Sequence, residues 1–264
     1  MDIPFTKAHG TGNDFIILYS EDLKSINLTP DLIQQLCNRR IGIGADGLLL
    51  LSPDNVLDFN MDYYNNDGSW ETMCANGARC AVLYMHQRGF IKIKTAFYTG
   101  DGPHDAEIIN GNHIRLRMKT PQYKTDLISV EGFRGVHVDS GARHFVIPVE
   151  DLSEVNVYES GKKIRFSNDF SPKGINVNFY TQLSPNSIHV ETYEKGIEQM
   201  MLSCGSGSVA AAFHASKTLG IQNLIKVTVP GGELNIEFDL NWENVWLTGG
   251  VMLLFTSTIH LEGL

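Results

Sequence analysis

The chain has 264 residues, 42% of them hydrophobic, enough to bury the core of one large domain or two modest ones. Its formal charge of −9 comes from scattered acids, and an acidic chain without a Lys/Arg cluster is poorly suited to bind nucleic acid or anionic lipid. The chain has no apolar run of the roughly 20 residues that a membrane span needs. Residues 1–4 lack the basic and apolar regions of a signal peptide. We therefore expect a soluble cytoplasmic protein.

Four cysteines do not form a disulfide framework in a chain of this size, so we interpret them as free thiols. No pair has the CxxC spacing of a zinc ribbon, and Cys74 and Cys80 are six residues apart, which does not place them on one face of a helix. A structural metal is therefore not expected. Cys37 and Cys80 are interpreted as core thiols.

Turn residues and apolar spacing organise the first half of the chain. Thr29 and Pro30 predict a helix start, as N-cap and first helical residue, and the helix is expected to run to about Arg40. In chain order the pattern predicts a loop with two glycines that feeds a strand over 5–18, this helix, strands over 48–51 and 59–64, a turn over 65–69, a helix after Cys74 that ends at Gly89, and strands over 91–98, 106–109 and 113–118.

Pro121 marks the expected passage into the second half, which gives lobes over 1–119 and 120–250. A last apolar strand over 251–264 is expected to be inner and to join the first lobe. Between these points the pattern predicts strand runs within 136–149, strands over 175–181 and 188–193, a helix after Cys204 that ends at Gly220, and strands over 225–229, 233–238 and 245–247.

One device occurs twice in the chain. Cys74 and Cys204 each stand at a turn of small residues that opens an amphipathic helix, and each helix ends at a glycine before a β-rich stretch. The repetition indicates two related halves that bring the thiols face to face.

A thiol at a helix N-terminus lies beside unpaired backbone N–H groups and the positive end of the helix dipole, which favours the thiolate. The same N–H groups favour a carboxylate ligand. Two such helix ends at one ligand would let one thiol remove a proton from a carbon while the other returns one to the opposite face. Such a site must exclude water, because the α-proton beside a carboxylate is a very weak acid.

Ordinary explanations compete with this chemistry. A cysteine before a helix is more often a buried small hydrophobe, and Asn13, Asn65, Asn76 and Asn176 could each be a turn residue. His144 could be a structural hydrogen-bonding residue. The segment 42–47 lacks the Lys-Ser/Thr of a P-loop, so nucleotide binding is not expected.

Along nearly its whole length the chain resembles the diaminopimelate epimerases. The motifs that carry the resemblance are Gly12-Asn13-Asp14-Phe15, Arg40-Ile41-Gly42-Ile43-Gly44-Ala45-Asp46-Gly47, Tyr64-Asn65-Asn66-Asp67-Gly68-Ser69, Met73-Cys74-Ala75-Asn76-Gly77-Ala78-Arg79-Cys80, Asn176-Val177-Asn178-Phe179 and Cys204-Gly205-Ser206-Gly207. The resemblance implies a cofactor-independent two-base isomerase that acts on LL-diaminopimelate in lysine and cell-wall synthesis. It also implies an α/β fold of two pseudo-symmetric lobes, each an antiparallel, barrel-like sheet around a central helix, with the active site in the cleft between them, in a homodimer.

Site residues are implied by the same resemblance. Cys74 and Cys204 match the acid–base pair, and the backbone of Ala75, Asn76, Gly205 and Ser206 matches the cradle for the reacting carboxylate. The residues that match binding of the substrate, chiefly at its far end, are Asn13, Asn65, Asn176 and Glu194. His144 and Glu194 match polar residues near the cysteines.

Departures from the family pattern cluster at the far end of the substrate. Gly141-Ala142-Arg143-His144 stands where the family usually has Gly-Asn-Pro-His, and Lys195 stands where it usually has an arginine that grips a carboxylate with two prongs. One hypothesis is that Arg143 supplies the missing guanidinium. A second is an amino-acid racemase with another substrate. Two further hypotheses are a non-catalytic amino-acid-binding paralogue and a thiol–disulfide enzyme.

Overall fold

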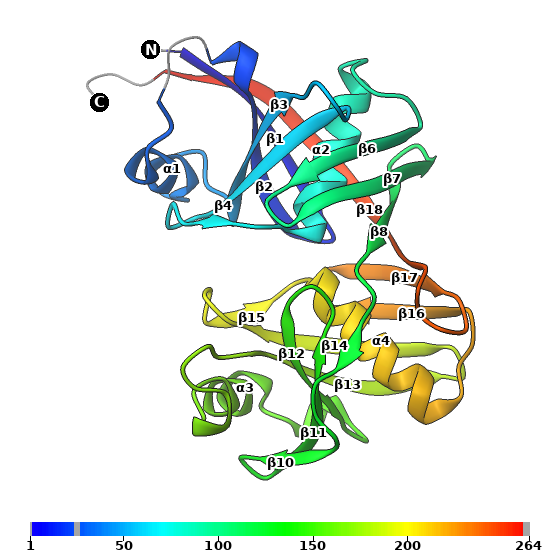
Figure 1. The fold of residues 1–264 in the computed structure, drawn as a ribbon. Helices are drawn as coiled ribbons and strands as arrows, with labels where there is room; N and C mark the ends of the chain where they lie inside the picture. Colours follow the sequence, from blue (N-terminus) through cyan, green and yellow to red (C-terminus); the bar gives the residue numbers. More distant parts are fainter. Residues whose placement is uncertain (1, 24–26, 261–264) are drawn as a thin grey trace. The chain divides into compact units, whose positions relative to one another are not determined.

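A computed structural model describes residues 2–23 and 27–260 (Figure 1). By contacts between Cα atoms the chain forms two compact units: residues up to Leu116 with those from Gly249 onward, and Arg117–Thr248. In the described part of the chain, no helix is both long and apolar enough to span a membrane.

The first unit is a barrel. Its elements are β1 (Asp2–Gly10), β2 (Asn13–Tyr19), α1 (Pro30–Cys37), β3 (Gly47–Pro53), β4 (Phe59–Asn65), β5 (Trp70–Glu71), α2 (Ala75–Gln87), β6 (Lys94–Thr99), β7 (Gly102–Asn110), β8 (His113–Met118) and most of β18 (Val245–His260). Among the described residues eight strands form a closed ring in the order β1, β2, β3, β4, β6, β7, β8, β18. The pairs β2–β3 and β4–β6 are parallel.

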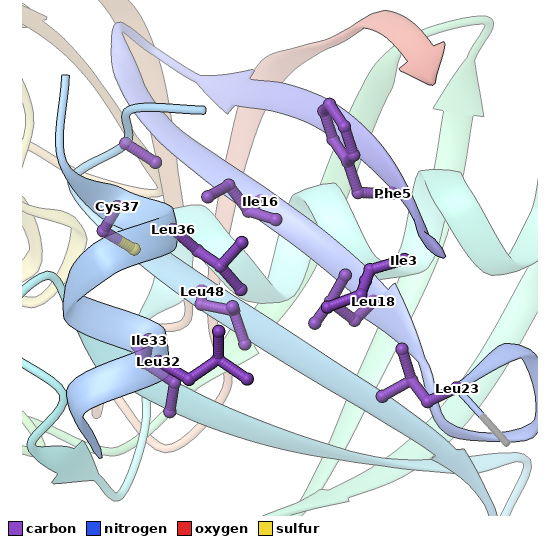
Figure 2. Close-up of a cluster of buried hydrophobic side chains, with 11 residues drawn as sticks. Ile3, Phe5, Ile16, Leu18, Leu23, Leu32, Ile33, Leu36, Cys37 and Leu48 are labelled. Carbon is purple, nitrogen blue, oxygen red and sulfur yellow. The ribbon is translucent and has the colours of Figure 1, made fainter. Parts of the chain in front are cut away.

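Helix α2 is the centre of this barrel. It packs against β1, β2, β3, β4 and β7, and its residues from Ala75 to Met85 are all buried. Helix α1 covers another face of the sheet, where Leu32, Ile33 and Leu36 pack onto Ile16 and Leu48 (Figure 2).

The second unit repeats this plan. Its elements are β9 (Gln122–Tyr123), β10 (Ile128–Val130), β11 (Phe133–Asp139), β12 (Arg143–Pro148), α3 (Val157–Arg165), β13 (Asn176–Ser184), β14 (Ser187–Glu194), β15 (Gln199–Met201), α4 (Gly205–Leu219), β16 (Leu224–Val229), β17 (Gly232–Phe238) and the start of β18. Helix α4 packs against β12, β13, β14, β16 and β17, while α3 packs against β13 and β14.

The strand connections of the two units correspond step by step. In the first unit β1–β2 is antiparallel, α1 leads to the parallel pair β2–β3, β3–β4 is antiparallel, and α2 leads to the parallel pair β4–β6. In the second unit β11–β12, β12–β13, β13–β14 and β14–β16 repeat this series around α3 and α4. The predicted fold class is confirmed: a mixed α/β fold in which a mainly antiparallel, barrel-like sheet surrounds a central helix, twice.

Some predicted elements were wrong in extent. Residues 5–10 were expected in a loop but belong to β1, because this segment pairs with β2 on one side and β18 on the other. Helix α1 ends at Cys37 and not near Arg40, since the Asn38 side chain turns away to accept hydrogen bonds from the backbone of Arg40 and Ile41.

Two features of the second half were not predicted. Helix α3 was missed, although Asn156 caps it by accepting from the Glu159 amide. The strands expected over 245–247 and 251–264 are one continuous strand, β18, as far as His260, and residues 261–264 of the second prediction lie outside the described residues. The prediction that the last strand is buried was wrong for the part after Val251: Met252, Leu254 and Phe255 are each about half exposed, at 49%, 46% and 52%.

Candidate functional site

Cys74 and Cys204 occupy the same position on their helices. Each is the N-cap residue, with φ and ψ of −131° and 115° at Cys74 and −128° and 110° at Cys204. Each carbonyl accepts the first helical hydrogen bond, from Ala78 N at 2.8 Å and from Ser208 N at 2.9 Å. Both side chains are half-buried. The sequence therefore builds two nearly identical backbone settings for a thiol.

The small residues after each cysteine allow close packing at these turns. Backbone N–H groups in the first turn of a helix have no intrahelical acceptor, so Ala75, Asn76, Gly205 and Ser206 lie where a carboxylate would find donors. A Cβ on Gly207 would lie 2.3 Å from the Asn178 amide nitrogen, which explains the glycine there.

Amide side chains surround Cys74. Asn13 Oδ1 lies 3.8 Å from the sulfur and accepts a hydrogen bond from Asn76 Nδ2 at 3.2 Å. Asn13 is held by its own Nδ2, which donates to Asp46 Oδ2 at 2.8 Å, and Arg39 in turn binds Asp46. The structure therefore brings together Asn13, Asn76 and Cys74, three of the predicted site residues.

Hydroxyl, imidazole and amide groups surround Cys204. Ser206 Oγ lies 3.7 Å from the sulfur and 3.0 Å from His144 Nε2. His144 Nδ1 lies 2.8 Å from Asn178 Oδ1, and Asn178 Nδ2 donates to Thr192 Oγ1 at 2.6 Å. These groups form one continuous chain of hydrogen bonds from the thiol into the interior of the unit.

The direction of this chain follows from charge. His144 is fully buried, and burial lowers its pKa to about 4, so the ring is neutral near pH 7. Because Asn178 presents its oxygen, His144 Nδ1–H donates to it and Nε2 accepts from the Ser206 hydroxyl. Ser206 then has lone pairs left that can accept a hydrogen bond from the thiol of Cys204.

Asn176 holds two backbone segments together. Its Nδ2 donates to Arg143 O at 3.1 Å, and its Oδ1 accepts from Lys195 N at 2.9 Å. Asn176 thereby fixes the spacing between the two segments that depart from the family pattern. Glu194, the last residue of β14, directly precedes Lys195.

Arg143 and His144 point to opposite faces of β12, since side chains alternate along a strand. His144 faces α4, whereas Arg143 lies on the side of Phe145, which packs in the core beneath α3. Burial is the main cause that lowers the pKa of His137, and the charge of Arg143 is the next, so these two side chains are neighbours. Ala142, the other departure at this turn, accepts a hydrogen bond from Ser140 N through its carbonyl.

The other predicted residues have structural partners. Asn65 accepts from Tyr63 Oη at 2.7 Å and donates to Ser69 Oγ at 3.1 Å, which closes the β4–β5 hairpin. Cys37 and Cys80 are buried, as predicted, and burial raises the pKa of Cys37 to about 12.

Sequence reasoning assigned no role to Arg79 or Asn178. Asn178 is a fully buried amide between Val177 and Phe179, and an isolated polar residue in an apolar strand was the signal that could have found it. Arg79 is a fully buried cation inside α2, five residues after Cys74, and its charge among the buried, mostly apolar residues of that helix was a comparable signal.

Several known proteins of similar sequence are diaminopimelate epimerases. The pattern of that family matches residues 5–124 and 136–253. The diaminopimelate epimerase of Aquifex aeolicus is 38% identical over 98% of this chain and 98% of its own length. That of Flavobacterium psychrophilum is 40% identical over 96% of this chain and 98% of its own length.

Solved structures share the fold at low sequence identity. A probable proline racemase from Agrobacterium radiobacter superposes with a TM-score of 0.75 at 14% identity, covering 98% of this chain and 93% of its own. A hydroxyproline epimerase from Agrobacterium vitis gives a TM-score of 0.73 at 14% identity, covering 98% and 92%. The sequence matches, which run through both units, show the family directly: this chain belongs to the diaminopimelate epimerase family.

Proposed function

We propose that this protein interconverts LL- and meso-diaminopimelate, with Cys74 and Cys204 as the two acid–base groups. The observation that carries the proposal is the pair of half-buried thiols at helix N-caps with matching backbone, in a chain of this family. One sulfur, as the thiolate, removes the α-proton. The other, as the thiol, delivers a proton to the opposite face of the same carbon, and reversal of direction exchanges the roles.

The two helix N-termini supply the stabilisation that this chemistry needs. Removal of the α-proton moves negative charge onto the substrate carboxylate, where backbone N–H donors of the cradle residues would meet it. Donors preorganised for such charge contribute about 3–4 kcal/mol each in enzymes, and a positioned base or acid adds about 10²- to 10⁴-fold. No cofactor is required in this scheme.

Conversion of LL-diaminopimelate by the fully reduced protein tests the proposal. We expect the meso isomer to form, and its rate of formation to fall by about 10²- to 10⁴-fold when Cys74 or Cys204 is replaced by alanine. Replacement of Cys37, a buried thiol with no role in the scheme, serves as the matched control. A Cys74→Ala protein that still converts the substrate at the parent rate would refute the two-thiol assignment.

Recognition of the far end of the substrate needs a separate test, because Ala142, Arg143 and Lys195 depart from the family pattern. A panel of L-amino acids in D₂O identifies the substrate, since only a substrate gains deuterium at Cα. Diaminopimelate is expected to give the fastest exchange. Faster exchange of an amino acid without a distal carboxylate would instead support a racemase of altered specificity.

We also propose a homodimer in the cytoplasm. The half-exposed apolar side chains of Met252, Leu254 and Phe255 on β18 support self-association. A reducing compartment suits a reaction that needs two free thiols. Sedimentation equilibrium that fits a monomer of 29.4 kDa at micromolar concentration would contradict the dimer.

A further inference from the structure

Helix α2 carries a guanidinium that is completely buried. Arg79 Nη1 donates to Ala75 O at 3.2 Å, and Nη2 donates to Thr11 Oγ1 at 3.0 Å and to Asn76 Oδ1 at 2.9 Å. All three acceptors are neutral, and the buried Nε has no hydrogen-bond partner. Within the described residues the guanidinium contacts no carboxylate. A buried charge without a counter-charge is costly, so it calls for an explanation.

Ionisable groups on the strands around α2 are engaged elsewhere. Lys7 on β1 pairs with Asp14 on β2 at 2.6 Å, and His104 on β7 pairs with Asp101 at 2.7 Å. The imidazole of His9 on β1 accepts from Gly12 N.

On β4, the Tyr63 hydroxyl donates to Asn65, and Asp62 accepts from the indole of Trp70. On β7, Glu107 faces Lys94. None of these groups supplies the counter-charge of Arg79.

The groups that could act on the charge of Arg79, if they were thiolates, are Cys80 of the same helix and the N-cap residue Cys74. Burial lowers the pKa of Arg79 to about 10, which leaves it charged near pH 7, while Cys80 and Cys74 act in the opposite direction. Cys80 is fully buried, and burial raises the pKa of its thiol far above the neutral range, so it stays uncharged. Cys74 is the remaining candidate.

We propose that Arg79 is a positioning residue that holds a fixed positive charge beneath the N-terminus of α2 and makes Cys74 the thiolate of the resting protein. The guanidinium also binds the side chains of Asn76 and Thr11. These hydrogen bonds hold the turn before β2 and the first turn of α2 in place around Cys74. The inference deepens the proposed function, because it assigns the starting protonation state of the acid–base pair.

Cys204 provides the contrast. The residue five positions after it is Val209, which is fully buried and carries no charge. The hydrogen bonds through Ser206 and His144 instead leave an acceptor for the Cys204 thiol. At Cys74 the 3.8 Å contact with Asn13 Oδ1 also suits an S–H group, but a thiol is a weak donor and this oxygen already accepts from Asn76. The buried charge therefore outweighs it.

The test measures the alkylation rate of each thiol by iodoacetamide as a function of pH, resolved by mass spectrometry on the full-length reduced protein. Cys74 is followed in a Cys204→Ala protein, and Cys204 in a Cys74→Ala protein. Arg79→Gln removes the charge but keeps a hydrogen-bond donor, whereas Arg79→Lys keeps the charge and loses the several donors of the guanidinium. Circular dichroism verifies that each variant is folded.

In the parent, Cys74 is expected to titrate about one pH unit or more below Cys204, the size of effect that an opposite charge produces. Arg79→Gln is expected to slow alkylation of Cys74 about tenfold at pH 6.5 and to leave Cys204 unchanged, while Arg79→Lys retains the parent profile. An unchanged Cys74 profile in Arg79→Gln, or equal shifts in both variants, would overturn the proposal. If Arg79→Gln does not fold, Arg79→Lys provides the test. The proposal is then overturned if Cys74 of Arg79→Lys is alkylated with the same pH dependence as Cys204.

Alkylation requires no substrate, so this result is independent of epimerisation. A protein with the predicted profiles but no conversion of diaminopimelate would refute the proposed function alone.

Discussion

The N-terminal ends of α2 and α4 have the same backbone and different chemical surroundings. At Cys74 the neighbours are amides and the buried cation Arg79, whereas at Cys204 they are neutral hydrogen-bonding groups led by Ser206 and His144. A repeated fold thus places two thiols alike, and the residues that differ between the repeats make them chemically unequal. This inequality suits a reaction in which one thiol must start with a proton and the other without one.

Of the changes considered, replacement of either cysteine should lower kcat the most. Cys74→Ala and Cys204→Ala are each expected to lower kcat by about 10²- to 10⁴-fold, the contribution of a placed acid or base. Discontinuous assays of the conversion rate, with each isomer in turn as the starting material, measure kcat of both variants. If only one of the two variants loses activity, the reaction uses a single base and the comparison fails.

Acid should lower the free energy of unfolding, because His144 near Cys204 takes up a proton when the protein unfolds. The pKa of this buried ring is lowered from 6.5 to about 4, so the unfolded chain binds more protons than the folded protein between these values. Stability contributed by the neutral ring is therefore complete above pH 6.5 and falls as the pH drops towards 4, by about 3 kcal/mol in total. Urea unfolding at a series of pH values measures the slope.

His144→Gln is the matched control for this slope. Glutamine keeps one donor and one acceptor for Asn178 and Ser206 but does not titrate. His137 and His214, whose pKa values burial also lowers, are present in both proteins and are therefore part of the background against which the two slopes are compared. A variant as sensitive as the parent between pH 6.5 and 4 would show that His144 does not cause the loss.

Arg143 tests the hypothesis that this chain has a substitute for the usual distal arginine. If Arg143 binds the distal carboxylate, Arg143→Ala should raise KM for diaminopimelate by about ten- to a hundredfold, because a charged contact contributes about 1.5–3 kcal/mol. Its place on the α3 side of β12 favours Lys195 instead. Steady-state kinetics of Arg143→Ala and Lys195→Ala side by side identify the ligand: the variant whose KM stays unchanged does not bind it.

Two glycines at equivalent positions give the smallest predicted difference. A Cβ on Gly77 would meet the terminal Cδ2 of Leu49 at 2.8 Å, whereas one on Gly207 would lie 2.3 Å from Asn178 Nδ2 and 3.2 Å from the Cys204 sulfur. Gly207→Ala should therefore lower kcat about tenfold and destabilise the protein by about 1–3 kcal/mol. Gly77→Ala should change kcat less than threefold, since a leucine side chain can shift. Similar losses in both would indicate that the hydrogen-bond chain at Cys204 has no special role.

Local signals were sufficient to predict the helices that carry the cysteines. The turns of small residues at Cys74 and Cys204 and the terminal glycines set α2 and α4 correctly, and Gly220 has the left-handed conformation that its position requires. The Thr29 cap and Pro30 likewise start α1 as predicted, with the Leu32 amide donating to Thr29 Oγ1.

Tertiary contacts decided what local signals missed. Residues 5–10 form a strand because β2 and β18 lie on both sides of them, and no local pattern contains that information. Arg79 has one partner from a distant segment, Thr11, besides the local Ala75 and Asn76, and Asn178 is bound by the distant His144. The family motifs identified the cysteines, but the difference between their surroundings became visible only with these contacts.

The isotopic composition of substrate and product in D₂O tests the two-thiol account most directly. With LL-diaminopimelate and the reduced protein, early meso product should carry solvent deuterium at the inverted carbon, while the remaining LL pool stays protiated. That pattern arises because the thiol that takes the substrate proton is not the one that delivers its replacement. Deuterium that enters the LL pool as fast as the product would mean that one group performs both steps, and the account would be wrong.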